Sequence, residues 1–500
     1  MLLALVWPMT TAIAQQAENE QLVRNVWYQV NVFDHPVGLV HARTVKRQAE
    51  GETLYVTTQI LETSLLRFGQ KFAQKIEQRS CYSPNGEVRE ITLRTESSSG
   101  QIVTLEWFLN ETGKLIRKTP IGKQFLEEEI ASETPFVSES FIELMLTKVA
   151  KKKQNRTISN VLFAVSNRIE QMHIEYLSSL SNNEVIVLQS YFAAEPEKRI
   201  KYWYRVEDLS APYHMEAYEF GQTTKIDRIN FQQVSEIRGR LGTFDVGNEF
   251  LVAMEKTELQ SVNPHQLHLE LTRDAAIDWL KIPTDLRQQV ISTQDEKLEL
   301  VTRNQFEIEQ AGQEAIPEIK PSRILASSPD IQQWSNRVVT TLQDQHSQVT
   351  SSMIVKAMRA SMDDQMKSFN YASGFETAAQ VAVSKQGDCT EYAVLLAALL
   401  REQKIPARVA FGLIYSPALN SFSGHMWTEA YCESGWVMVD ASQPATYPKS
   451  YYIKYGDHFL ANASQPGILE IFNHTLRFNR GLRIRLLNPS QQRPDEAATK

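Results

Sequence analysis

Apolar and polar residues alternate with a period of two along much of the first half of the chain, which is the pattern of antiparallel strands with one buried face. A helix is expected at 138–149, and a second series of strands runs from 158 to about 234. Short strands at regular spacing predict an antiparallel β-rich region over residues 20–260, as one large domain or as two similar halves. The strands predicted before the helix lie at 26–33, 39–46, 54–60, 72–81, 88–95 and 102–110.

The second half of the chain changes from strand to helix spacing. Residues 264–320 are predicted to be a β connector, with strands at 266–272 and 297–301. Apolar spacing of three and four residues then predicts three helices, followed by an apolar helix that begins near Cys389. The three helices are predicted at 330–342, 351–367 and 374–383. Residues 325–485 are therefore expected to form a separate domain that follows the β-rich region.

Four methionines in this region are expected to form a core face rather than a metal or cofactor site, because they recur at helical spacing. They are Met353, Met358, Met362 and Met366.

Cys389 is the strongest candidate for chemistry in the sequence. It follows Gly387 and Asp388 at the point where a loop becomes an apolar helix. The N-terminus of a helix carries unsatisfied N–H groups and a partial positive charge, which favour a thiolate and can hold a developing oxyanion. Gly387 would let a substrate backbone approach closely, and Asp388 would cap the helix.

The sequence on either side of Ser434-Gly435 predicts a β-hairpin that can bring His425 and Asp440 together. Side chains alternate between the two faces of a strand. These two residues therefore share a face only if paired residue numbers add to an odd value. That register requires a hairpin loop of two or four residues.

Cys389, His425 and Asp440 would then have complementary roles. His425 would deprotonate the thiol and later protonate the leaving amine, while Asp440 would fix the imidazole tautomer. Glu429, on the same strand face as His425, is the next candidate for the third role.

The segments around these residues resemble the bacterial transglutaminase-like superfamily. They read GDCTEYAVLLAALLREQKIPARVAFGLIY, GHMWTEAY and WVMVDAS, and the resemblance covers roughly residues 325–460. It implies a papain-like α+β catalytic domain with a Cys-His-Asp triad. The roles of nucleophile, base and third member fall on Cys389, His425 and Asp440. Two positions outside the triad depart from the family pattern, since many relatives have His in place of Tyr392 and Gly in place of Lys404.

These observations favour a cysteine enzyme that acts on amide bonds of peptides or proteins through a thioester. Hydrolysis is favoured over transamidation, because an amine competes with water only where a shaped site excludes water. The alternative is a non-catalytic peptide-binding or scaffold protein that uses the same cleft. The sequence has no phosphate loop, HExxH, CxxC or EF-hand motif, so we expect no cofactor and no metal.

Aromatic residues of the first half are expected in the core rather than on a sugar- or peptide-binding face, because strand aromatics supply much of the core area. They include Trp27, Trp107, Tyr202, Trp203 and Tyr204. The role of the β-rich half stays open at this stage.

Composition and charge restrict the partners and the location. The 500 residues carry a net charge of −7, which gives no general attraction to nucleic acid. Residues 1–14 resemble a signal peptide, and no later stretch approaches 18 continuous apolar residues. We therefore expect an exported protein of the periplasm or cell envelope without a spanning segment, while the oligomeric state stays open.

Three cysteines make a poor disulfide framework for a chain of this length. Cys81 and Cys432 are expected to be buried free thiols. The polar tail at 488–500 is expected to be disordered.

Overall fold

The computed structural model describes residues 20–487 apart from 50, 98–99, 101, 122–123, 131–134, 165–167, 182, 195, 197–198, 220–221, 248–250, 256–264, 274–281, 286, 295, 305–316, 320–321, 323, 371–375, 461–478 and 480. The chain forms two compact units, Met1–Leu66 with Lys71–Asp245 and Arg67–Gln70 with Val246–Lys500. The predicted signal peptide at 1–14 and the predicted disordered tail at 488–500 lie outside the described residues. Among those that are described, no helix has the length and apolar content needed to cross a membrane.

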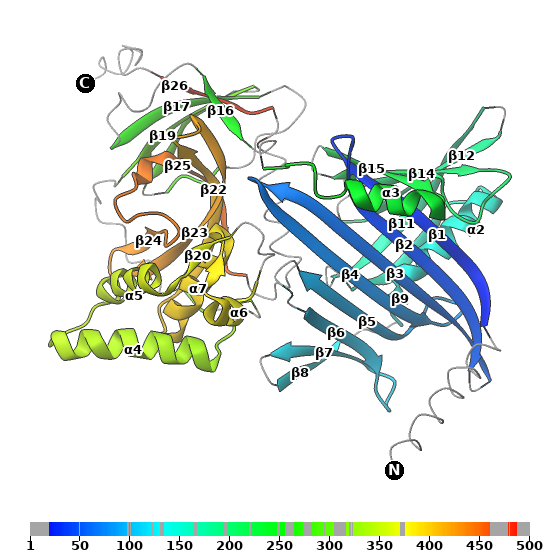
Figure 1. The fold of residues 1–500 in the computed structure, drawn as a ribbon, viewed down its shortest axis with the longest axis horizontal. Coiled ribbons are helices and arrows are strands. Elements are labelled where there is room, and N and C mark those ends of the chain that lie inside the picture. Colours follow the sequence, from blue (N-terminus) through cyan, green and yellow to red (C-terminus); the bar gives the residue numbers. More distant parts are fainter. Residues whose placement is uncertain are drawn as a thin grey trace, which may run out of the picture. The chain divides into compact units, whose positions relative to one another are not determined.

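The first unit is built on one sheet of 15 strands (Figure 1). The strands are β1 (Glu20–Val32), β2 (His35–Ala49), β3 (Glu52–Arg67), β4 (Gln70–Tyr82), β5 (Val88–Ser97), β6 (Ile102–Leu109), β7 (Leu115–Ile121), β8 (Gln124–Ile130), β9 (Val137–Ser138), β10 (Arg156–Phe163), β11 (Arg168–Leu180), β12 (Val185–Phe192), β13 (Arg199–Arg205), β14 (His214–Glu219) and β15 (Gln222–Ile229). Their order in the sheet is β8-β7-β6-β5-β4-β3-β2-β1-β15-β14-β13-β12-β11-β10-β9. Nearly every neighbour is also the next strand in sequence, so the predicted antiparallel β-rich region is confirmed.

Helices cover parts of this sheet. The 3₁₀ turn η1 (Glu139–Phe141) leads into α2 (Ile142–Lys152), which packs against β11 and β12. Helix α3 (Phe231–Arg240) begins at a capping box formed by Asn230 and packs against β2. Of the aromatic residues singled out in the sequence, three are buried in this unit as expected: Trp107, Tyr202 and Tyr204.

The second unit combines helices with a sheet of nine strands. Its sheet strands are β16 (Val252–Glu255), β17 (Gln266–Thr272), β18 (Gln288–Gln294), β19 (Lys297–Arg303), β22 (Ala407–Ser416), β23 (Ser421–Cys432), β24 (Gly435–Val439), β25 (Tyr452–His458) and β26 (Arg483–Leu486). The order is β18-β19-β17-β26-β16-β23-β22-β25, with β24 paired to β23. Three strands from the region 264–320 thus belong to this sheet, and one of them, β18, was not predicted.

The two end strands of this sheet meet through one side chain. The amide of Gln288, at the start of β18, donates to the backbone oxygen of Lys454 at 2.9 Å and accepts from its N–H at 2.8 Å. Lys454 lies in β25. An amide side chain thereby satisfies both backbone hydrogen-bonding groups of one residue in the strand that ends the sheet.

Helices of the second unit lie together beside the strands (Figure 1). They are α4 (Pro329–Gln345), α5 (Ser351–Gln365), α6 (Ala378–Ser384) and α7 (Cys389–Glu402), with the short strands β20 (Ser368–Phe369) and β21 (Gln386–Gly387) and the 3₁₀ turn η4 (Lys449–Tyr451). The apolar helix α7 is central, because it contacts β22 and β23 as well as the other three helices. Met358 and Met362 of α5 are fully buried in the same core, as their spacing predicted.

Helix α7 ends in a Schellman motif at Lys404. The N–H of Ile405 donates to the oxygen of Leu400 at 3.1 Å, and the N–H of Lys404 donates to that of Arg401 at 2.9 Å. Lys404 has a φ of 60°, the left-handed conformation that glycine adopts without strain. This is the position at which many members of the resembled family carry glycine.

Replacement of Lys404 by glycine should therefore stabilise the second unit. We expect Lys404→Gly to unfold with a free energy about 0.5–1 kcal/mol higher than wild type, since the left-handed strain exceeds the added freedom of the unfolded chain. The matched control is Lys404→Ala, which also removes the exposed side chain but keeps Cβ. Denaturant unfolding of both variants checks this, and equal stability of the two would contradict it.

Candidate active site

Cys389 is the first residue of α7, and side chains on both sides of the thiol close the N-terminus of this helix. The carboxylate of Asp388 caps the helix by accepting from the N–H of Thr390 at 2.8 Å. In return, Glu391 accepts from the N–H of Asp388 at 2.9 Å, which completes a capping box. The second Asp388 oxygen lies 2.9 Å from Nη2 of Arg67, a residue of the same unit. The predicted cap is confirmed, and Cys389 remains partly exposed.

The buried side chain of Glu391 explains the glycine that precedes the cap. A Cβ atom at Gly387, where φ is +155°, would lie 2.2 Å from the Cβ of Glu391. Burial, followed by the neighbouring Asp388, raises the pKa of Glu391 well above its usual range. The need for glycine thus comes from the packing of Glu391, and the approach of a substrate backbone stays a prediction.

His425 lies in β23, and Asp440 directly follows β24. Thr428 pairs with Val439 and Cys432 pairs with Gly435, so the hairpin loop has two residues. This is the predicted odd register, although the loop is Glu433-Ser434 rather than Ser434-Gly435. Nε2 of His425 lies 2.7 Å from Oδ2 of Asp440, and His425 is only 8% exposed.

The thiol of Cys389 lies close enough to interact with the same imidazole. Burial alone would lower the pKa of His425, but attraction to Asp440 and Cys389 and hydrogen bonds to both outweigh it and raise the pKa to about 10. The structure therefore brings all three predicted residues together, with His425 between the other two.

The carboxylate of Asp440 accepts four hydrogen bonds. Oδ1 accepts from the N–H and the hydroxyl of Ser442, at 2.8 and 2.7 Å. Oδ2 accepts from His425 and from the phenol of Tyr452, the latter at 2.8 Å. Burial would raise the pKa of Asp440, but the imidazole and these donors outweigh it and lower the pKa below its usual value.

Sequence reasoning identified neither Ser442 nor Tyr452. Two-residue spacing after an aspartate is a known turn signal and could have identified Ser442. No local signal indicates Tyr452, because its position depends on the placement of β25.

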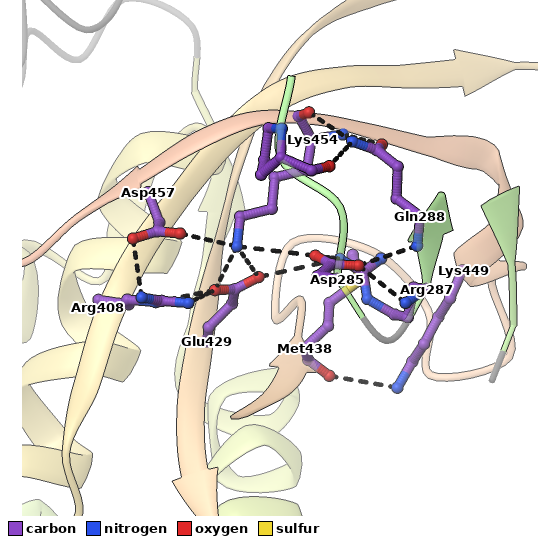
Figure 2. A network of polar contacts seen from close by, with 10 residues as sticks. Asp285, Arg287, Gln288, Arg408, Glu429, Met438, Lys449, Lys454 and Asp457 are labelled. Carbon is purple, nitrogen blue, oxygen red and sulfur yellow. Dashed lines mark hydrogen bonds and ion pairs between the residues drawn. The ribbon is translucent and has the colours of Figure 1, made fainter. Parts of the chain in front are cut away.

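Two cations fix the backbone around Asp440. Arg359 of α5 donates from Nε to the oxygen of Asp440 at 3.2 Å and from Nη2 to the oxygen of Gln443 at 2.6 Å. Lys449 donates to the oxygen of Met438 at 3.2 Å (Figure 2). The chain is thus fixed on both sides of the carboxylate.

Glu429 has different partners from those that its place on β23 suggested. Figure 2 shows its carboxylate turned toward Lys454 and Arg408. Lys454 Nζ lies 2.8 Å from both oxygens, and Arg408 Nε lies 2.9 Å from Oε2. With these partners Glu429 is a member of a buried ion-pair network, and Asp440 is the carboxylate that contacts His425.

The remaining cysteines differ from Cys389 in their surroundings. Cys81 and Cys432 are both free and buried, as expected. Burial raises the pKa of both thiols, which disfavours the reactive thiolate. Among the described residues, no three His, Cys, Asp or Glu side chains group as a metal site.

The stretch that contains all three residues matches a known family. Residues 332–441 match the sequence profile of the Transglutaminase-like superfamily. The second unit carries a transglutaminase-like domain. Members of this superfamily are typically Cys-His-Asp enzymes, and the predicted family resemblance is confirmed over this stretch. A comparison with curated proteins gives no match.

Three solved structures resemble parts of the chain only weakly. A β-barrel-like protein of the uncharacterised DUF1849 family from Brucella abortus is 12% identical, with 41% of this chain and 95% of that chain covered and a TM-score of 0.29. A candidate cysteine protease from Cytophaga hutchinsonii is 12% identical, with 44% and 84% covered and a TM-score of 0.24. A candidate protease from Parabacteroides distasonis is 11% identical, with 79% and 65% covered and a TM-score of 0.17. At these TM-scores the likeness carries no argument about fold or activity.

The raised pKa of His425 predicts a pH-dependent contribution to stability. The pKa of His425 is about 10 in the folded protein and 6.5 in the unfolded chain. The free energy that the charged imidazole contributes to folding is therefore fully present below pH 6.5 and is lost as the pH rises toward 10. We expect the difference in melting temperature between wild type and His425→Gln to shrink between pH 6.5 and pH 10. Thermal melts of both proteins across this range check it. A difference that stays constant would show that His425 does not carry a charge in the folded protein.

Proposed function

We propose that the second unit is a thiol enzyme that acts on amide bonds of peptides or proteins, with Cys389 as nucleophile, His425 as base and Asp440 as third member of the triad. The observation that carries this proposal is the imidazole held between a buried carboxylate and the thiol at a capped helix N-terminus. The transglutaminase-like domain in which this group lies supports the same reading.

The proposed reaction has two halves. The thiol proton passes to the imidazole before substrate binds, in line with the raised pKa of His425. The thiolate sulfur then attacks the amide carbonyl carbon, and N–H groups at the start of α7 face the developing oxyanion. The imidazolium then gives its proton to the leaving amine, the C–N bond breaks and a thioester forms. Asp440 holds the imidazole in one orientation through both steps.

Hydrolysis is the favoured second half. A water molecule loses a proton to His425 and attacks the thioester carbonyl, which releases the carboxylic acid and restores the thiol. Transamidation would need an amine to reach the thioester ahead of water. We further propose an exported location, supported by the signal-peptide-like sequence at 1–14, and with it peptides or proteins of the cell envelope as substrates.

The masses of products distinguish the reactions. Purified protein is incubated with a cell-wall peptide digest and a proteome digest, each with an added primary amine. We expect fragments whose summed mass exceeds that of the substrate by one water per cleaved bond, while a transamidase would join the amine with loss of ammonia. Cys389→Ala, which keeps the α7 cap, is the matched control and should give no product.

The runner-up is a peptide-binding or scaffold protein with the same cleft. It is favoured if peptides bind equally to wild type and Cys389→Ala while neither protein changes their mass. The partly exposed thiol and its contact with His425 support the enzyme instead, because peptide binding alone needs neither.

Asp440→Asn should keep the fold and reduce turnover by roughly 10- to 1,000-fold, because an amide can present the wrong hydrogen-bonding edge to the imidazole. The loss is expected to be smaller than in serine enzymes, since a thiolate–imidazolium pair can form before substrate binds. Turnover of a substrate found above is measured beside a thermal melt of the same sample. Asp364→Asn, exposed on α5, is the control and should keep full activity. Full activity in Asp440→Asn would remove Asp440 from the triad.

A further inference from the structure

Tyr452 reaches the proposed triad from β25, which is separated from the strand of His425 by β22. It is the first residue of β25, which pairs with β22 and not with the hairpin of His425 and Asp440. The side chain is buried, with the residue 3% exposed, and its hydroxyl donates to Oδ2 of Asp440 at 2.8 Å. The same oxygen contacts Nε2 of His425.

We infer that Tyr452 is a positioning residue of the triad, whose phenol holds Oδ2 of Asp440 in the place where this oxygen meets the imidazole. The inference rests on the proposed function, since it assigns Tyr452 a role through Asp440 and none in contact with substrate.

The geometry of the carboxylate explains why a second anchor is needed. The terminal torsion of an aspartate is broad and turns both oxygens together, so donors on both oxygens hold the carboxylate more firmly than donors on one. Ser442 holds Oδ1 from within the same turn. Among the described residues, the carboxylate accepts its other hydrogen bonds from His425 and Tyr452. Tyr452 is therefore the partner that holds Oδ2 of Asp440 independently of His425.

The ring of Tyr452 also packs around the imidazole. Its centroid lies 5.7 Å from that of His425 and 5.4 Å from that of Trp427. Phenylalanine would retain these ring contacts and lose only the hydroxyl. Tyr452→Phe thus isolates the hydrogen bond from the packing.

An ion-pair network two residues further along β25 fixes the strand that carries Tyr452. Lys454, with a side chain 3% exposed, places Nζ 2.8 Å from Glu429 and 2.8 Å from Asp457 (Figure 2). Glu429 belongs to β23, the strand of His425. The network therefore ties the strand of the phenol to the strand of the imidazole across β22.

The cations near Asp440 bind groups other than its carboxylate. Arg359 and Lys449 donate to backbone oxygens around it. Arg287 lies near Asp285 and Glu429, at 3.7 and 3.9 Å. Of these three cations, all described by the structure, none makes a hydrogen bond to the carboxylate, which leaves the phenol as its partner from outside the hairpin.

The test measures the rate at which iodoacetamide alkylates Cys389 as a function of pH, with peptide mapping to separate Cys389 from Cys81 and Cys432. This readout needs no substrate. Without the phenol, Asp440 can turn from the imidazole, and the imidazolium that supports the thiolate is less stabilised. We expect Tyr452→Phe to react about tenfold more slowly than wild type at pH 6 and to approach the wild-type rate at alkaline pH, a shift of about one pH unit in the profile.

The matched control is Tyr455→Phe, which removes a buried phenol from the same strand. Its hydroxyl bonds to Asn479 at 3.1 Å, away from the triad, so its profile should follow wild type. In the background of Asp440→Asn, Tyr452→Phe should cause no further slowing, because the two residues act through one bond.

The outcomes separate this inference from the proposed function. A reactive Cys389 with identical profiles in wild type and Tyr452→Phe overturns the inference and leaves the proposed function standing. Equal slowing in Tyr452→Phe and Tyr455→Phe at every pH also overturns it, because that result indicates general loosening. A wild-type Cys389 that does not react at pH 6 overturns both.

Discussion

The buried carboxylate of Asp440 is the constraint on which the rest of the second unit depends. A charge removed from water is costly unless it is paired and fully hydrogen-bonded. Asp440 meets this condition with donors from its own turn, from β23 and from β25. Three parts of the chain must therefore be in register before the charge is satisfied, and that register is the one that places His425 beside Cys389. Stability and the proposed chemistry demand the same arrangement.

Two buried carboxylates on the same face of the hairpin have acquired different roles through their partners. Glu429 faces Lys454 and Arg408, which form ion pairs with its carboxylate. Asp440 faces an imidazole, which can lose its charge and regain it. Only the second arrangement can respond to a proton moving to or from sulfur. The sequence predicts that both acids lie on one face of the hairpin. It does not predict the partners that make Glu429 a structural acid, because Arg408 and Lys454 come from β22 and β25.

Local patterns predicted the parts of the site that lie close in sequence. The cap at Asp388 and the face shared by His425 and Asp440 follow from spacing alone, because helix starts and two-residue hairpins have fixed geometry. Tyr452 and Lys454 could not be predicted in the same way. Their contacts depend on β25 pairing with β22, and strand order has no local signature. The missed strand β18 has a different cause, since it pairs with the next strand, β19, but consists mostly of polar residues and lacks the apolar alternation that predicts a strand.

The part of the chain that holds the triad in place is therefore longer than the stretch that matches the family. Residues 332–441 contain Cys389, His425 and Asp440, but β25 begins at Tyr452, beyond that stretch. A chain cut at 441 would keep all three reactive side chains and leave Oδ2 of Asp440 without its phenol. Glu429 would also lose Lys454 and remain as a buried negative charge with Arg408 as its main partner. The strands on both sides of the matched stretch are thus part of the site, because they satisfy the charges that the matched residues bury.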